Sequence, residues 1–400
     1  MRAGLIGGGT LMRHNSLRGV DRTVAGWSYR RVFLTGATGL IGGQLLHDLL
    51  MIPQVEEVTC LVRQGNSKEA EQRLVSRLKR TGIRTKDLEA VMKRVRCASG
   101  EMTKDLWGME QSELDRLRAN TDLFINCAAS TSFVDIESCE AINVSGTRRM
   151  LGILEGACNL KRLVHFSTAT LCGQVPDTVM KEDDSLAKPG VHVVAYTRTK
   201  AEAERILWAK ADELPLLVVR PSITMARGSR DRKHARLFLW SLAAMVQLPY
   251  VPVKKDSRID IVPLDFVVKS TVRLLAKGDN LKHRCYHLTA GEVAAVTADE
   301  VRAAACKAAN VKGPKFIPPA EWSEKHMQKI EELELGTLYE ALLLYLPFIN
   351  LNLVYDNTRL IEELGENLPP LPKFDQYVDS MLHTMAPDRV PAPTLDGFGL

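Results

Sequence analysis

The sequence predicts an α/β fold, in which a doubly wound parallel sheet is combined with a smaller, mostly helical C-terminal region. Short apolar runs of strand length alternate with amphipathic helical stretches along much of the chain. That alternation is typical of a parallel sheet with helices on both faces. The 400 residues, of which 45% are hydrophobic and 25% charged, suffice to bury a large core of this kind.

The expected strands are short, apolar and bounded by polar or turn-forming residues. They are Arg31–Thr35, Glu57–Val62, Arg94–Ala98, Leu123–Cys127, Arg162–Ser167 and Leu216–Val219. Helical periodicity fills the intervals between them, at Leu40–Leu50, Ser67–Thr81, Ala141–Asn159 and Thr197–Ala211. The longest apolar stretch, Ala341–Val354, contains a proline and two asparagines and is too short to cross a bilayer.

Charge and cysteine usage disfavour several classes of protein. The net charge of +5 is mild and basic residues alternate with acids, so we expect no nucleic-acid partner. The eight cysteines never form a C-x-x-C pair and most lie in apolar runs. This usage is typical of reduced thiols in a cytoplasmic protein and argues against a disulfide framework or a zinc site. The nine histidines are scattered, and we expect no metal.

The first expected strand runs directly into a glycine-rich turn and then a helix. Gly36 would allow the tight turn, Gly39 the approach of a pyrophosphate, and Gly42 close packing of helix on strand. The helix N-terminus would supply amide donors to the phosphates. A turn of this kind is weak by itself, but its position at the head of the first βαβ unit predicts a dinucleotide site. Its expected members are Thr35, Gly36, Thr38, Gly39, Leu40, Ile41 and Gly42.

The end of the second strand favours NADPH over NADH. NAD sites usually carry an acid about 20 residues after the glycines, where it binds the ribose 2′-hydroxyl. Here Arg63 ends the strand and no acid follows in the next three residues. A guanidinium can pair with a 2′-phosphate, and Arg73 is a candidate second partner. The alternative for each arginine is a solvated surface charge.

A tyrosine and a lysine four residues apart open a later helix and share one of its faces. They are Tyr196 and Lys200. A nearby ammonium lowers the pKa of a phenol, which can then donate a proton to an oxyanion as hydride arrives. The pair alone has roughly even odds of arising by chance, but its context is stronger. Thr168, with Ser167 as the less favoured choice, ends a strand at the sheet edge where such folds bind ligands. Either hydroxyl could instead bond within its own turn.

The chain resembles the extended short-chain dehydrogenases/reductases over about residues 30–290. The motifs that carry the resemblance are Thr35–Gly42, Asn126–Ala129, Ser167–Thr168, Tyr196–Lys200 and Arg220–Ser222. Finer features are similar to fatty acyl-CoA reductases and carrier-protein thioester reductases, namely Leu61–Arg63 with Ala70 and Arg73, Ala128–Phe133, Asn143–Thr147 and Asp260–Val267. The chain departs from the family at Gly100-Glu101-Met102, where the family has Gly-Asp-Leu.

The resemblance implies a Rossmann sheet and an NADPH-dependent reductase. It further implies cofactor contacts at Tyr196, Lys200, Glu101, Met102, Ala128, Ala129, Ser130, Pro221, Ser222 and Ile223. The expected reaction is reduction of an acyl thioester, on coenzyme A or a carrier protein, to an aldehyde, and a second reduction to the alcohol is left open. Thr168 and Tyr196 would stabilise the oxyanion and Lys200 would hold the nicotinamide ribose. The apolar segments Leu237–Val253 and Leu338–Val354 suit an acyl chain or peripheral lipid contact, although such segments are more often plain core.

Composition and resemblance together divide the chain into four parts. Residues 1–29 are expected to be a disordered basic extension, with an organelle transit peptide as the alternative. The nucleotide-binding domain is expected to take residues 30–225 and 258–290, and the substrate region residues 226–257 and 291–385. The proline-rich residues 386–400 are expected to be a disordered tail.

Two other functions compete with thioester reduction. A ketoreductase, dehydrogenase or epimerase acting on a sterol, flavonoid or nucleotide sugar would use the same threonine, tyrosine and lysine. A non-catalytic dinucleotide sensor would need neither Tyr196 nor Lys200. Thiol catalysis by Cys127 or Cys172 is disfavoured because neither has an evident histidine partner in the sequence.

Overall fold

A seven-stranded parallel sheet forms the centre of the computed structural model, which describes residues 24–63, 67–184, 186, 191–225 and 242–377. Its strand order is β12-β7-β5-β4-β1-β2-β3. In that order the strands are Cys285–Leu288, Leu216–Pro221, Arg162–Phe166, Leu123–Asn126, Arg31–Thr35, Glu57–Val62 and Val95–Ser99. The chain leaves β1 in one direction to reach β2 and β3 and returns to the other side for β4. This reversal beside β1 is the switch point at which doubly wound sheets bind ligands.

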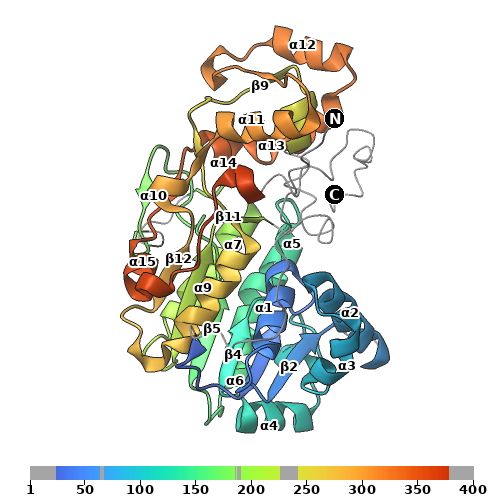
Figure 1. Cartoon of the computed structure of the whole chain (residues 1–400), viewed down its shortest axis with the longest axis vertical. Coiled ribbons are helices and arrows are strands. Elements are labelled where there is room, and N and C mark those ends of the chain that lie inside the picture. Colours follow the sequence, from blue (N-terminus) through green and yellow to red (C-terminus); the bar gives the residue numbers. More distant parts are fainter. Residues whose placement is uncertain (1–23, 64–66, 185, 187–190, 226–241, 378–400) are drawn as a thin grey trace, which may run out of the picture.

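Helices cover both faces of the sheet (Figure 1). On one face the apolar sides of α1 (Leu40–Leu50), α2 (Ser67–Thr81), α3 (Thr85–Met92), α9 (Leu264–Ala276) and α15 (Thr358–Leu364) form one core with the strands. On the other face lie α4 (Gln111–Asn120), α6 (Gly146–Leu154) and α7 (Ala195–Trp208). Phe33 and Phe124, paired in register on neighbouring strands, stack at 5.0 Å between ring centroids in this second core. Both faces of each central strand are therefore buried, as its continuous apolar run requires.

The C-terminal part of the chain forms a helical region beyond the sheet (Figure 1), and this region has a hydrophobic core of its own. Its helices are α11 (Ala298–Ala309), α12 (Glu324–Glu332), α13 (Gly336–Leu343) and α14 (Leu346–Asn350), while the short helix α10 (Gly291–Ala294) lies outside this core and contacts β15. The strand pair β14–β9 (Lys315–Phe316, Tyr250–Val251) lies within this core. Three other short strand pairs lie between it and the rest of the chain: β11–β8 (Ile261–Pro263, Ile223–Met225), β10–β13 (Arg258–Ile259, Val296–Thr297) and β15–β6 (Val354–Tyr355, Val179–Met180). Residues 242–253 and 298–349 supply most of this core, so both pieces of the expected substrate region meet in it.

The sheet and the helical cover agree with the fold class expected from the sequence. β1, β2, α1 and α2 have the predicted bounds, and the other predicted strands shift by at most two residues at an end. The predicted helix Ala141–Asn159 is wrong in detail. A short helix α5 (Ile136–Cys139) and a π-helical turn (Glu140–Ser145) precede α6, and α6 ends before Gly156, whose φ of +81° is incompatible with a helix.

The disordered extension predicted for residues 1–29 is placed too far along the chain, because the folded part already includes Val24. Val24, Trp27 and Tyr29 are buried against the sheet, and the Trp27 indole donates a hydrogen bond to the Tyr29 carbonyl at 2.7 Å. Aromatic side chains of this size stabilise a core strongly, so the fold begins before β1. The remainder of the extension and the predicted tail 386–400 lie outside the described residues. None of the helices in the described part of the chain is long and apolar enough to span a membrane.

Candidate active site

A cavity of about 850 Å³ lies at the carboxyl ends of the parallel strands. One end is lined by the glycine-rich turn after β1 and by the residues that follow β2, β3 and β4. The other end is lined by residues from the C-terminal region, including α14. The cavity therefore extends from the switch point of the sheet to the interface with the second core, which is where such folds bind cofactor and substrate.

The glycine-rich turn is shaped for close approach at the N-terminus of α1. Gly36 has a φ of +73°, and a Cβ there would lie 2.8 Å from the Ala128 nitrogen. A Cβ on Gly42 would lie 2.2 Å from the Gly36 carbonyl oxygen, so this glycine packs the helix against the turn itself. Gly39 is the residue preceding the first turn of α1, and its amide donates to Gly36 at 2.9 Å. The turn thus presents the unpaired amides of a helix N-terminus to the cavity.

Two of the expected cofactor contacts lie behind the cavity wall. The buried Thr35 hydroxyl donates to the Asn126 side chain at 2.9 Å and accepts from the Cys127 and Ala128 amides at 3.0 Å each. Ser130 exchanges two backbone hydrogen bonds of 2.9 Å with the Asn143 side chain. Neither residue is among the described residues that line the cavity. In the structure both residues fix the wall of the cavity, and their contact with a cofactor stays a prediction.

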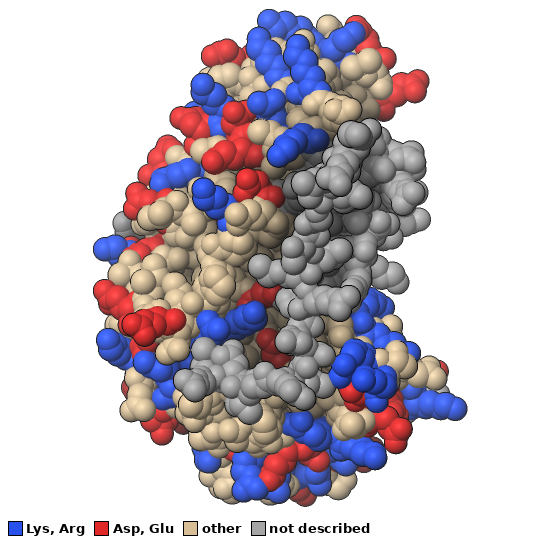
Figure 2. Space-filling model, in the orientation of Figure 1, with Lys and Arg blue, Asp and Glu red and all other residues tan. Residues whose placement is uncertain are grey.

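The two arginines predicted to select the cofactor come together at the cavity. Arg63 and Arg73 are exposed and both line it, and the Arg73 guanidinium donates to the Arg63 carbonyl at 2.7 Å. Glu101 and Met102 lie on the same wall after β3. Over the rest of the visible face, positive and negative side chains are interspersed, as the mild net charge suggests (Figure 2).

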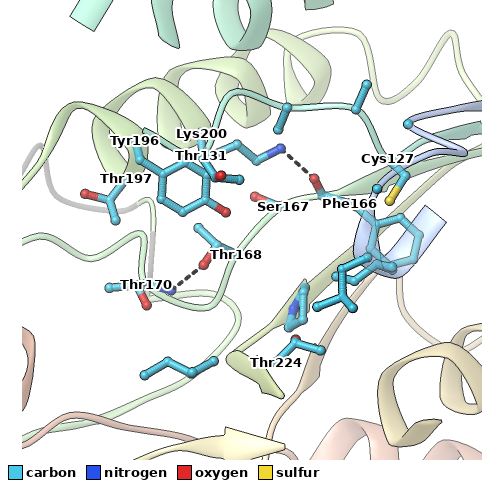
Figure 3. A pocket seen from close by; sticks show the side chains of 18 of the residues that line it. Cys127, Thr131, Phe166, Ser167, Thr168, Thr170, Tyr196, Thr197, Lys200 and Thr224 are labelled. Atoms are coloured by element: carbon cyan, nitrogen blue, oxygen red, sulfur yellow. Dashed lines mark hydrogen bonds between the residues drawn. The ribbon is translucent and has the colours of Figure 1, made fainter. Parts of the chain in front are cut away.

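The expected catalytic side chains line another wall of the cavity (Figure 3). Tyr196 and Lys200 come from successive turns of α7, and Thr168 comes from the segment after β5. The Thr168 side chain lies next to the Tyr196 phenol (Figure 3). The Lys200 Nζ donates to the Phe166 carbonyl at 2.5 Å. Ser167 also lines the cavity, but its buried hydroxyl has no hydrogen-bond partner among the described residues.

Burial dominates the acid–base properties of these groups. Burial raises the pKa of Tyr196 to about 12, although interaction with the Thr168 hydroxyl acts to lower it. Burial lowers the pKa of Lys200 to about 8. From the sequence we expected the Lys200 ammonium to lower the pKa of the Tyr196 phenol. In the protein without cofactor the phenol pKa is raised instead, because burial disfavours both the tyrosinate and the ammonium. Burial likewise raises the pKa of Cys127 to about 12, which keeps this cavity-lining thiol protonated at neutral pH.

Asp260 and Tyr355 are site residues that the sequence analysis did not assign. The nearly fully buried Asp260 lines the cavity and accepts hydrogen bonds from the Ala290 and Gly291 amides at 2.8 and 3.1 Å. Burial raises its pKa to about 6, and these amides oppose the rise. The buried Tyr355 donates from its phenol to the Thr170 hydroxyl at 3.0 Å. The motif Asp260–Val267 could have identified Asp260 as a site residue, whereas no sequence motif marks Tyr355.

An aromatic group closes the cavity beside Tyr196. Phe133 lies at 6.4 Å from the Tyr196 ring, nearly parallel to it. The same phenylalanine contacts Tyr345 at 5.4 Å and Phe348 at 5.5 Å between ring centroids. Aliphatic residues complete this end of the cavity: Leu242, Met245, Ile259, Val301, Ile349 and Leu353. Both apolar segments singled out in the sequence contribute to this lining, while Leu338 and Leu342 belong to the plain core.

A sequence profile of the male sterility protein family, an NAD-binding domain, matches residues 34–271. The chain belongs to this family. It is an NAD(P)-dependent oxidoreductase of the extended short-chain dehydrogenase/reductase type, in the branch that includes the thioester reductases. Its site therefore binds a nicotinamide dinucleotide, as the sequence indicated.

Individual relatives come from two groups of proteins. The chain is 28% identical over 272 residues to nonribosomal peptide synthetase asaC of Aspergillus flavus, a match covering 64% of this chain and 26% of the relative. It is 27% identical over 277 residues to fatty acyl-CoA reductase 1 of Xenopus laevis, covering 61% and 54%. The chain thus spans about a quarter to a half of the length of these relatives. The terminal R domain of the myxalamid PKS-NRPS pathway has the same fold, with 24% identity, a TM-score of 0.76 and coverage of 92% and 93%.

Proposed function

We propose that the chain reduces an acyl thioester with NADPH, with Tyr196 as proton donor and Thr168 and Lys200 as its catalytic partners. The observation that carries this proposal is the convergence of these three side chains on one cavity that also holds a dinucleotide cradle and an apolar wall. Fatty acyl-CoA reductases and peptide synthetases with terminal reductase domains are among the relatives, which supports a thioester as substrate.

The cavity fits an NADPH molecule at its switch-point end. A Cβ at Gly36 or Gly42 would collide with the backbone of Ala128 or of the turn itself, so glycine at both positions permits the tight turn that presents the amides of α1 to the cavity. Arg63 and Arg73 line the cavity after β2, and a planar guanidinium pairs well with a phosphate, which supports a 2′-phosphate at this place. Pro221, Ser222 and Ile223 line the cavity near the catalytic side, where the nicotinamide amide would lie.

Bound NADPH would supply the hydride, and residues of the chain would stabilise the negative charge and transfer the proton. Thr168 and Tyr196 would donate hydrogen bonds to the carbonyl oxygen as negative charge develops there. Tyr196 would then transfer its proton to that oxygen. Lys200 would hold the ribose, and in its charged form it would offset the rise in phenol pKa that burial causes. The collapse of the resulting hemithioacetal gives an aldehyde and a free thiol.

The acyl group would occupy the apolar end of the cavity. We propose that residues 226–257 and 291–385 serve as the substrate region, because Met245, Tyr345 and Phe348 bring its side chains to the wall beside Tyr196. Coenzyme A and carrier proteins present the same phosphopantetheine thioester, so either could deliver the substrate. A second hydride transfer to the aldehyde, with the same proton donor, would give the alcohol.

Release of thiol is the decisive test of this proposal. Purified protein is incubated with NADPH and a panel of acyl-coenzyme A thioesters, carrier-bound thioesters, ketones and nucleotide sugars. We expect NADPH oxidation coupled to one free thiol per acyl group, measured with Ellman reagent, on a medium or long acyl thioester. Tyr196→Phe should lower both signals together. NADPH consumption on ketones without thiol from any thioester would instead identify a ketoreductase and refute the proposal.

A further inference from the structure

A third hydroxyl lies on the catalytic wall beyond Tyr196 and Thr168. Thr170 lines the cavity and is partly exposed to it. Its amide donates to the Thr168 hydroxyl at 3.4 Å, and Figure 3 shows Thr168 between Tyr196 and Thr170 along the wall. The three side chains therefore present a row of hydroxyl groups to the cavity.

Tyr355 holds the Thr170 side chain in place from the C-terminal region. Its phenol donates to the Thr170 hydroxyl at 3.0 Å, across 185 residues of sequence. The Tyr355 backbone is held by β15 and by a hydrogen bond from the Thr289 hydroxyl to its carbonyl at 3.0 Å, and its ring packs nearly perpendicular to the His287 ring at 5.9 Å between centroids. A donor that is held by rigid elements before the substrate arrives costs little to organise during the reaction.

The hydrogen bond between Tyr355 and Thr170 leaves one hydroxyl hydrogen free to bind a ligand. Thr170 and Tyr355 have one O–H each, and the hydrogen bond between them uses one of the two. Within the described residues no acceptor is found for the remaining O–H of Thr170, which faces the cavity. Accepting a bond from Tyr355 also polarises this hydroxyl and strengthens it as a donor.

We propose that Thr170 is a further catalytic residue whose hydroxyl donates a hydrogen bond to the thioester sulfur, with Tyr355 as its positioning residue. The inference rests on the proposed function. Tyr196 and Thr168 already give two donors to the carbonyl oxygen, and the reacting carbon bears only an oxygen, a sulfur and the acyl chain. A donor one place further along the row meets the sulfur, because an acyl chain offers no acceptor at that position.

The bond serves the step in which the carbon–sulfur bond breaks. After hydride addition and protonation by Tyr196, the hemithioacetal returns its O–H proton to the Tyr196 oxygen. The oxygen electrons form the aldehyde double bond, and the electron pair of the carbon–sulfur bond leaves on sulfur. Thr170 stabilises the developing thiolate without transferring its own proton. The thiolate then takes a proton from solvent and departs as the thiol.

Leaving-group dependence tests this role. Thr170→Val removes the hydroxyl and keeps the shape, and Thr170→Ser keeps the hydroxyl. Thioesters of one acyl group with N-acetylcysteamine and with thiophenol differ in the basicity of the leaving thiolate. We expect Thr170→Val to lower kcat about tenfold or more on the alkyl thioester, the scale of a lost hydrogen bond to a charged group, and by a clearly smaller factor on the aryl thioester. Thr170→Ser should restore most of the activity, and the Kd for NADPH should not change.

Tyr355→Phe should show the same preference for the aryl leaving group with a smaller overall loss. Tyr377→Phe is its matched control, since that phenol donates to the Ile261 carbonyl at 3.1 Å and is not among the described residues lining the cavity. Equal losses on both thioesters for Thr170→Val would show that the side chain merely supports Thr168, which overturns this inference alone. Absence of thiol release by the wild-type protein would overturn the proposed function and this role with it.

Discussion

Burial of Lys200 should make part of the folding stability depend on pH in a predictable direction. The side chain is 3% exposed, and burial lowers its pKa from 10.5 to about 8. The folded protein therefore binds fewer protons than the unfolded chain between these two pH values, and stability rises with pH across that window. The difference corresponds to about 3 kcal/mol, since each pKa unit is worth about 1.4 kcal/mol.

Comparison with Lys200→Met isolates this contribution. Methionine keeps the length of the side chain and carries no charge. Loss of the hydrogen bond to Phe166 and changes in packing add an offset that does not depend on pH. Burial raises the pKa of Cys127 and Tyr196 to about 12, so both stay protonated throughout the window. The stability difference between the two proteins should therefore be constant below pH 8 and move by about 3 kcal/mol in favour of wild type by pH 10.5.

Urea unfolding followed by the fluorescence of the five tryptophans measures this difference at fixed ionic strength. Lys210→Met is the control, because Lys210 is exposed and pairs with Glu213 on the surface at 2.8 Å. Its difference from wild type should be nearly flat with pH. A flat profile for Lys200→Met would show that Lys200 keeps an ordinary pKa in the folded protein, and a profile that favours the variant as pH rises would show that its pKa is raised; either result would refute the reasoning.

Three further substitutions test the remaining parts of the site. Arg63→Asp should abolish or reverse a preference for NADPH over NADH of at least about tenfold (about 1.4 kcal/mol), measured by titration of both cofactors, and equal affinities in the wild type would contradict the role of this arginine. Tyr196→Phe should leave the Kd for NADPH nearly unchanged and lower turnover about a hundredfold or more. Tyr377→Phe is the control. Near-normal turnover of Tyr196→Phe would show that another group donates the proton. Gly42→Ala should prevent cofactor binding or destabilise the fold, because the added carbon would lie 2.2 Å from the Gly36 carbonyl oxygen, and normal binding by a stable variant would refute the packing argument.

Local pattern was enough to predict the elements that place the cofactor site. β1, α1 and β2 follow from continuous apolar runs and helical periodicity, and the glycine-rich turn between the first two is set by its own residues. Within α7 the helical spacing alone brings Tyr196 and Lys200 to one face. In each of these cases the relevant interactions join residues close together in the chain, so the sequence carries them directly.

Other features were missed because tertiary contacts override local preference. The fully buried strand β12 is four residues long and includes a histidine and a tyrosine, so its apolar run is too short to distinguish from a turn. Trp27 and Tyr29 follow an arginine-rich stretch whose composition suggests disorder, yet they fill a gap beside the sheet. Thr35 belongs to the cofactor motif by position, and its hydroxyl is used by β4 and the segment after it.

The chemistry of the catalytic wall depends on contacts of this long-range kind. Tyr355 reaches Thr170 across 185 residues, and Asp260 accepts hydrogen bonds from the amides of Ala290 and Gly291. Both contacts tie the C-terminal region to segments that follow strands of the sheet. The glycine-rich turn and the arginines of the nucleotide end are thus encoded within one βαβ unit and the helix after it, whereas the substrate end exists only after the two cores have packed together. Substitutions at the interface between the cores should therefore change substrate turnover before they change affinity for the cofactor.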